Sequence, residues 1–408
     1  MAILDKNESR KPAIILSAHT AGLGVIRALA SMDIPIIVVS YDRRDMGANS
    51  RYVKEFIQSP NPEENEADFI GLLGNLAKRF NGCLLVPTSD ETLGAVSRNK
   101  KLLSRDYVVA CEEWETVRIF LDKKNCYALA ERIGVPAPKT RLPKSLSDLR
   151  FFSQDIGFPC VVKPTQSHIF FKSFRKKMVI VDNQEQLIRA FQESVDYGLE
   201  VMIQEYIPGN DDNGVNYNSY FYNGMPLCEF TAHKIRNAPP IIGSPAVLLS
   251  ERIPAVFKTG RKMLKAINYS GYSCMEFKKD SRDNTYKFME LNARHNLSSL
   301  LAWRCGINFP WLQYQHLMNG ELLYLHDYLQ GIYWIDTFRD IGFRLANLGK
   351  EDLTFLQLIQ PYLKPHIFAI FDFHDLRPFI ARLKDVFLSG KIGKQISPVR
   401  DPIMMKSG

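Results

Sequence analysis

The sequence lacks the features by which membrane and secreted proteins are recognised. None of its apolar runs approaches the roughly 18 to 20 residues that a membrane helix needs. The first segment, MAILDKNESRKP, is too charged to contain the apolar stretch of a secretory signal. We therefore expect a cytoplasmic protein without a membrane partner.

Cysteine is scarce, and its positions form no pattern. The 408 residues contain seven cysteines, an odd number without a C-x-x-C pair. Neither a disulfide framework nor a zinc site is therefore indicated. Internal repeats and low-complexity tracts are missing as well. The composition, 46% hydrophobic and 24% charged, is that of a globular protein, and the length allows about two to four domains.

Positive charge is in excess, because 52 Lys+Arg against 44 Asp+Glu give a net charge of +8. A nucleic-acid binder would gather such a surplus in one continuous basic stripe. In this chain the basic residues are interleaved with acidic ones. We therefore expect small anionic ligands rather than nucleic acid.

The first third of the chain alternates short apolar runs with helical patterns. The runs read as strands at residues 13–16, 36–39 and 83–86, and the helical patterns cover residues 23–31 and 65–80. This β-α-β alternation predicts a parallel sheet with helices on both faces. A further helical pattern at 115–133 is ended by Gly134, Pro136 and Pro138, which indicates a domain border.

The chain then changes to an α+β pattern. We expect a helix at 147–156, a strand at 160–163, and a second helix that begins at Asp182 with Glu185 in a capping box. Two hairpins follow. Asn223-Gly224 joins the runs 217–222 and 227–233, and a polar stretch joins 272–278 to 286–292.

A glycine turn is predicted after the first strand, at Gly22-Leu23-Gly24, with Asp42 just past the next strand. A dinucleotide would sit at this position. Arg27 replaces the third glycine of the dinucleotide pattern, and we expect its side chain to obstruct close packing between helix and strand. A dinucleotide site, an anion site at the helix N-terminus and a purely structural turn are the three alternatives.

A more specific constellation follows the domain border. Lys163 ends a buried strand, where a lysine has little reason to be unless it meets an anion. Because strand side chains alternate, Glu290, Asn292 and Arg294 share one face, and hairpin pairing can bring Glu276 beside Glu290. Two carboxylates and an amide oxygen suit Mg²⁺ that is bound together with phosphates. Each residue alone could be solvated or structural, but their order and spacing favour a site.

Together these segments resemble ATP-grasp ligases, in particular carbamoyl-phosphate synthase subunits and D-aspartate ligases. The resemblance covers roughly residues 12 to 320. It rests on the segments 18–24, 86–91, 121–123, 134–138, 160–164 and 204–209, and on Glu276 with Glu290-x-Asn292-x-Arg294.

The resemblance implies a site for ATP and Mg²⁺ (or Mn²⁺). Its residues and implied roles are as follows: Lys123 and Lys163 for the phosphates, Gln204, Glu205 and Ile207 for adenine, Asp211 or Asp212 for the ribose, Glu276, Glu290 and Asn292 for the metal, and Arg294 for the transferred phosphate. Segment 166–177 lacks the glycines that the family has there. We expect Lys172, Arg175, Lys176 or Lys177 to supply charge instead, unless the segment is a solvated hairpin.

Two more residues follow the hairpin strand 227–233. In related ligases this region faces the carboxylate substrate or the phosphate, so the resemblance implies a role for Lys234 and for Arg236, which could clamp a carboxylate bidentately. A structural charge pair is the alternative for Arg236. We expect His295 to be a hydrogen-bonded core residue rather than an acid-base catalyst.

The expected fold is mixed α/β and α+β. It has a pre-ATP-grasp parallel-sheet domain (1–115), two α+β subdomains of an ATP-grasp domain (116–200 and 201–325) and a helical C-terminal extension (326–408). The implied function is an ATP-dependent carboxylate-amine ligase that acts on small molecules, with room for a homodimer. A non-catalytic ATP-binding module is the first alternative, and a nucleic-acid binder and an NAD enzyme are weaker ones.

Overall fold

The computed structural model describes residues 10–165, 178–347 and 353–389, and three sheets organise them. The first is the predicted parallel sheet, which has the strand order β3-β2-β1-β4-β5. Its strands are β1 (Ala13–Leu16), β2 (Ile36–Ser40), β3 (Val53–Gln58), β4 (Leu84–Pro87) and β5 (Val108–Val109). The strands β3 and β5 were not predicted. Its helices are α1 (Thr20–Ala30), α2 (Glu66–Phe80), α3 (Asp90–Arg98) and α4 (Lys100–Leu103).

The predicted glycine turn is wrong, because Gly22 and Gly24 lie inside α1. The helix begins earlier than expected, and the His19 side chain caps it by accepting from the Ala21 amide at 3.1 Å. A Cβ at Gly22 would come within 2.4 Å of the Ser17 carbonyl oxygen, so this glycine permits close contact between helix and strand. Arg27 does not obstruct that contact. It is only 2% exposed and pairs with Asp375.

The predicted helix at 115–133 is two helices, α5 (Trp114–Leu121) and α6 (Lys123–Arg132). Asp122 separates them and caps α6, since its carboxylate accepts from the Lys124 amide at 3.1 Å. The break matters for the site because it makes Lys123 the first residue of a helix. The prolines beyond Gly134 lead into the next lobe.

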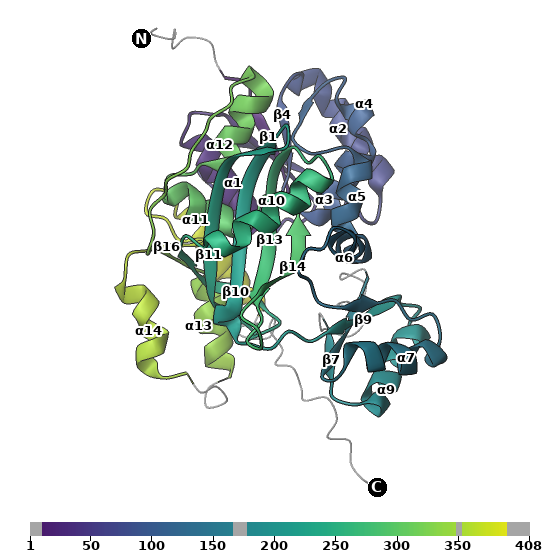
Figure 1. The fold of residues 1–408 in the computed structure, drawn as a ribbon. Coiled ribbons are helices and arrows are strands. Elements are labelled where there is room, and N and C mark those ends of the chain that lie inside the picture. Colours follow the sequence, from purple (N-terminus) through teal and green to yellow (C-terminus); the bar gives the residue numbers. More distant parts are fainter. Residues whose placement is uncertain (1–9, 166–177, 348–352, 390–408) are drawn as a thin grey trace.

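A four-stranded sheet with two helices forms a lobe beside the lower end of the largest sheet (Figure 1). Its order is β6-β9-β7-β8, with β6 (Thr140–Arg141), β7 (Cys160–Pro164), β8 (Val179–Val181) and β9 (Val201–Glu205). The helices α7 (Leu146–Ile156) and α9 (Gln184–Asp196) supply its apolar core. The cap of α9 is Asn183, which accepts from the Gln186 amide at 3.0 Å, rather than the predicted Asp182.

The largest sheet has seven strands in the order β14-β13-β10-β11-β12-β15-β16. They are β10 (Gly214–Tyr222), β11 (Met225–Ala238), β12 (Ser244–Ser250), β13 (Gly271–Lys279), β14 (Tyr286–Asn292), β15 (Tyr333–Ile335) and β16 (His366–Phe368). Both predicted hairpins, β10–β11 and β13–β14, are confirmed. The helices α5, α6 and α10 (Phe257–Ala266) cover one face, and α11 (Ser298–Arg304) and α12 (Phe309–Tyr314) cover part of the other.

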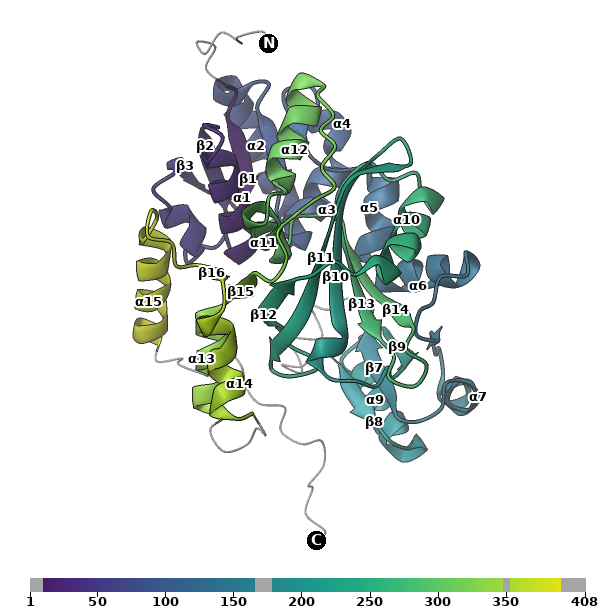
Figure 2. The ribbon, with the colours of Figure 1, turned by 60° about the vertical axis from the view of Figure 1, so that its left-hand side comes forward.

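The C-terminal extension is built into the rest of the molecule. It contains the expected helices, α13 (Thr337–Ala346), α14 (Phe355–Leu363) and α15 (Arg377–Ser389), but it also adds the unpredicted strands β15 and β16 to the largest sheet. In Figure 2, α15 lies beside the first sheet, and α13 and α14 lie below β15 and β16. None of the helices in the described part of the chain is both long and apolar enough to cross a membrane.

Candidate active site

Two carboxylates face each other on adjacent strands of the largest sheet. Glu276 of β13 is the direct register partner of Glu290 of β14, and Cys274 is the partner of Asn292. The alternating residues Met275 and Leu291 point to the other face, into the core beneath α10. The prediction that Glu276, Glu290 and Asn292 share one face is therefore confirmed, since direct register partners lie on the same face of a sheet.

Each carboxylate has a lysine beside it. The Lys234 ammonium lies 2.5 Å from a Glu276 oxygen, and the Lys123 ammonium lies 3.2 Å from Oε1 of Glu290. Burial lowers the pKa of Lys234, but the charge and hydrogen bond of Glu276 outweigh this effect and leave the pKa raised. Lys234 is therefore charged near neutral pH. The two ion pairs bring positive and negative groups together on this face.

Lys163 is a buried cation without a carboxylate of its own. It stands at the end of β7 and is 7% exposed, and its ammonium donates to the Tyr127 hydroxyl at 3.2 Å. Burial lowers its pKa, while the more distant Glu290 and Glu276 act to raise it. Within the described ranges no carboxylate lies at ion-pair distance from Lys163. An ammonium in this position suits an anion that arrives with a ligand.

The donor set fits a metal ion that is shared with phosphates. In the described part of the chain no group of three or more His, Cys, Asp and Glu residues could hold a metal alone. Two carboxylates and the Asn292 amide are too few for a cage made of protein only, but they suit Mg²⁺ that keeps other oxygen ligands. Asn216, the register partner of Glu276, also has a buried Oδ1 with no hydrogen-bond partner.

Arg294 follows β14 and reaches the first sheet. Its guanidinium binds both carboxylate oxygens of Asp90, at 2.6 and 2.9 Å, and Asp90 is the first residue of α3. Burial acts to lower the pKa of Arg294, but the charge and hydrogen bonds of Asp90 outweigh this effect and leave the pKa raised. The guanidinium therefore stays charged. This bidentate pair holds the segment that follows β14 against the domain of the parallel sheet.

The predicted adenine residues lie where β9 ends. Gln204 is buried and donates to the Thr140 hydroxyl at 2.9 Å, while Glu205 accepts from the Lys139 amide at 3.1 Å and pairs with Arg282. Ile207 is also buried. These contacts fix the segment between the two sheets, and the contact with adenine stays a prediction.

The two candidates for the ribose differ in their surroundings. The Asp211 carboxylate accepts from the amide and the side chain of Asn237, at 2.7 and 2.8 Å, and from the Ile241 amide at 2.6 Å. It therefore holds the loop between β11 and β12. Asp212 is exposed and is the better placed of the two for a ligand.

The predicted carboxylate clamp at Arg236 is wrong. Its guanidinium donates to both oxygens of Asp340, at 3.1 and 2.7 Å, and also to the carbonyls of Gln357 and Leu358. The side chain is buried, and all of these partners belong to the C-terminal extension. Arg236 therefore forms a structural charge pair. Lys172, Arg175, Lys176 and Lys177 lie outside the described residues.

A buried polar network, which the sequence did not reveal, supports β13 and β14 from the side of α11. The Tyr272 hydroxyl lies 2.7 Å from Oδ1 of Asn218, 2.9 Å from Oδ1 of Asn296 and 2.8 Å from the Ser299 hydroxyl. As predicted, His295 is a buried, hydrogen-bonded residue. Its Nε2 lies 2.9 Å from Oε1 of Gln313, and burial lowers its pKa to about 4. Only the spacing of Asn296, Ser298 and Ser299 just after the metal motif hinted at this network.

Comparisons with known proteins identify the architecture. Residues 122–309 match the family model described as the carbamoyl-phosphate synthase L chain, ATP binding domain. The chain carries an ATP-grasp domain. The resemblance drawn from the motifs is therefore confirmed for residues 122–309.

Curated relatives of this ATP-grasp protein include two kinds of ligase. D-aspartate ligase from Enterococcus faecium (strain Aus0004) is 26% identical over 242 residues, which are 55% of this chain and 56% of that protein. D-alanine--D-alanine ligase from Francisella tularensis subsp. tularensis (strain WY96-3418) is 26% identical over 200 residues, 47% of this chain and 64% of that protein. The chain thus spans less than two thirds of the length of these relatives.

Solved structures share the fold. L-amino acid ligase from Bacillus licheniformis has a TM-score of 0.60 at 16% identity. The superposition covers 77% of this chain and 75% of the ligase chain. N5-carboxyaminoimidazole synthetase from Staphylococcus aureus has a TM-score of 0.64 at 14% identity and covers 85% of this chain and 88% of its own. These likenesses cover a larger share of the chain than the family model does.

Proposed function

We propose that this ATP-grasp protein is an ATP- and Mg²⁺-dependent ligase that joins a substrate carboxylate to an amine. In the first step a carboxylate oxygen attacks the γ-phosphorus of ATP, ADP leaves, and an acyl phosphate forms. In the second step the amine nitrogen attacks the acyl carbon, phosphate leaves, and the nitrogen loses a proton. The product is an amide, and the substrates are amino acids or other small metabolites of the cytoplasm.

The observation that carries the proposal is the gathering of three lysines around the pair Glu276 and Glu290. Lys234 comes from β11 of the same sheet, Lys123 from the start of α6, and Lys163 from β7 of the four-stranded sheet. A triphosphate brings negative charge, which the lysines can bind once they release the carboxylates. Mg²⁺, when bound, would supply further positive charge at Glu276, Glu290 and Asn292.

The protein's own groups would work by position and charge. Lys163 and Lys123 would hold the phosphates in line, and the segment at Gln204 to Ile207 would hold adenine between the sheets. Arg294, fixed by Asp90, would stabilise the charge that develops on the transferred phosphate. Catalysis of this kind needs no covalent enzyme nucleophile.

The alternative is a module that binds ATP without catalysis, since a fold alone does not fix a function. The presence of Glu276, Glu290, Asn292 and Arg294 together argues against it, because a simple binder needs no full metal set. ATP binding without any turnover over a broad panel of carboxylates and amines would favour the module.

The direct test is substrate-dependent release of ADP, with hydroxylamine present to trap the acyl phosphate as a hydroxamate. Glu290→Gln should lose at least about a hundredfold in turnover, because one oxygen ligand of the metal becomes an amide. Glu185→Gln, an exposed change on α9, is the matched control and should keep full activity. Unchanged turnover of Glu290→Ala would refute the metal assignment.

A further inference from the structure

A cavity opens beside Arg294, just beyond the metal strands. It has a volume of about 310 Å³. Its lining comes from the segment after β5, the adjoining ends of β10 and β13, the segment after β14, and α12 with the turn that follows it, together with Pro87 and Lys100. Arg294 lines the cavity and lies two residues after Asn292. The volume lies at the lower end of the range of small-molecule sites.

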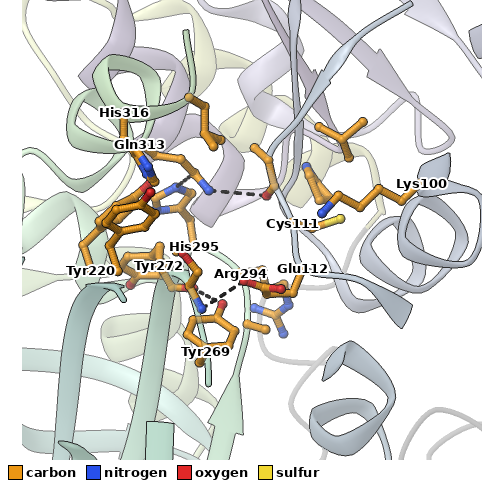
Figure 3. A pocket seen from close by; sticks show the side chains of 18 residues that line it. Lys100, Cys111, Glu112, Tyr220, Tyr269, Tyr272, Arg294, His295, Gln313 and His316 are labelled. Carbon is orange, nitrogen blue, oxygen red and sulfur yellow. Dashed lines mark hydrogen bonds between the residues drawn. The ribbon is translucent and has the colours of Figure 1, made fainter. Parts of the chain in front are cut away.

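Aromatic rings form much of the wall, as Figure 3 shows for Tyr220, Tyr269, Tyr272 and His316. Several of their polar atoms are already satisfied within the protein. The Tyr220 hydroxyl lies 2.8 Å from Nδ1 of His316, and the Tyr269 hydroxyl donates to the Tyr272 carbonyl at 2.5 Å. The wall therefore offers ring surfaces to a ligand and suits an apolar or aromatic group.

Glu112 is the one acid among the lining residues. One of its oxygens accepts from the Ser270 amide at 2.9 Å, which aims the carboxylate at the edge of β13. In Figure 3 it stands with Arg294 on the side of the cavity opposite His316. Burial raises the pKa of Glu112, and its charge in turn contributes to the raised pKa of Tyr269. The carboxylate thus faces the aromatic wall.

The two cations at the rim form their ion pairs with other acids, although the charge of Lys100 also acts to lower the pKa of Glu112. Lys100 pairs with Glu113 at 2.9 Å, and both arms of Arg294 hold Asp90. In the ranges that the structure describes, no cation lies at ion-pair distance from Glu112. A half-buried carboxylate with spare hydrogen-bonding capacity in an aromatic cavity suits a ligand that brings its own positive charge.

We propose that this cavity binds the amine substrate in its ammonium form, through Glu112, with an apolar or aromatic side group against the tyrosine rings. The ammonium passes one proton to the Glu112 carboxylate before the neutral nitrogen attacks the acyl carbon. The proposal rests on the ligase function and names the class of its second substrate. Glu112 and Arg294 stand on the same side of the cavity, so an ammonium group held by Glu112 lies near the residue assigned to the transferred phosphate.

Isothermal titration with L-phenylalanine amide tests the proposal without turnover. This probe has an ammonium and an aromatic ring but no carboxylate, and 3-phenylpropanamide is its uncharged counterpart. The titrations are run with a non-hydrolysable ATP analogue and without it. We expect the amide to bind the wild type, and Glu112→Gln to weaken this binding about tenfold or more because a charge-assisted hydrogen bond is lost. The uncharged compound should bind both proteins equally and more weakly.

Two variants complete the test. Glu115→Gln, an exposed change on α5 whose partner is Arg118 of the same helix, is the matched control and should bind like the wild type. Tyr222→Ala, which removes a ring that lines the cavity, should weaken binding of phenylalanine amide more than that of glycine amide. Equal binding to the wild type and Glu112→Gln, or no binding to the wild type under either condition, would overturn the inference.

The two proposals fail in different ways. Absence of hydroxamate from the wild type over the carboxylate panel would contradict the ligase function, whatever the titrations give. Normal ligation by the wild type together with unchanged amine binding by Glu112→Gln would contradict only the site inferred from the cavity.

Discussion

The ion pair between Arg236 and Asp340 should anchor the C-terminal extension. Both side chains are buried, with exposures of 6% and 0%, and the guanidinium also donates to two carbonyls of α14. Asp340 also pairs with Arg344 at 2.7 Å, so the loss of Asp340 leaves the buried guanidinium of Arg236 without any carboxylate among the described residues. Such a loss typically costs about 3 to 5 kcal/mol. We therefore expect Asp340→Asn to lower the free energy of unfolding by about that amount.

Urea denaturation and limited proteolysis would measure this effect. The transition that releases the extension should move to lower urea, and cleavage between β15 and β16 should become faster. Arg118→Gln, which removes an exposed pair on α5, should leave both unchanged. ATP affinity should change little in the folded fraction of Asp340→Asn, because neither partner is assigned to the nucleotide.

One result would refute this reasoning. If Arg236→Met keeps the wild-type stability but raises the KM for the carboxylate substrate, Arg236 is a substrate clamp after all. A double variant, Arg236→Met with Asp340→Leu, refines the comparison. The apolar pair should recover only part of the stability that Asp340→Asn loses, because Arg344 and the Tyr362 hydroxyl also lose their partner when Asp340 is replaced.

Three further predictions concern other parts of the site and fold. Burial lowers the pKa of Lys163, so the lysine should lose its proton, and ATP affinity should fall, at a lower pH than for an exposed lysine. Lys163→Met should bind ATP more weakly, and its affinity should not show this fall as the pH rises. Asp90→Asn should free Arg294 and lower kcat about tenfold or more while the Kd for ATP stays the same, as steady-state kinetics and calorimetry would show. Gly22→Ala should destabilise the protein by about 1 to 3 kcal/mol in urea denaturation, because its Cβ would meet the Ser17 carbonyl at 2.4 Å; full stability would refute the contact argument.

Local pattern was enough to predict the centre of the site. Side chains alternate between the two faces of a strand, and this alternation along β13 and β14 placed Glu276 and Glu290 on one face. The Asn223-Gly224 turn identified the neighbouring hairpin. Such features depend on residues close together in sequence. The resemblance to ATP-grasp proteins then followed from the order of the motifs.

What the sequence did not show depends on distant contacts. Arg236 meets a carboxylate 104 residues away, so nothing near it marks the position as structural. The strands β15 and β16 have three residues each and take their place from the sheet beside them. Similarly, the chain breaks between α5 and α6 because Asp122 caps α6. The apolar residues on both sides of Asp122 continue one helical pattern, so the sequence predicted a single helix.

The pair between Arg27 and Asp375 has a consequence for synthesis on the ribosome. These residues are 348 positions apart, yet the guanidinium of Arg27 is buried in α1 of the first sheet. At about 5 to 20 residues per second, the emerging first sheet waits tens of seconds for its counter-charge. During that interval a chaperone or water must cover the helix face that the segment before α15 later closes. The N-terminal domain is therefore the first to be made and among the last to be completed.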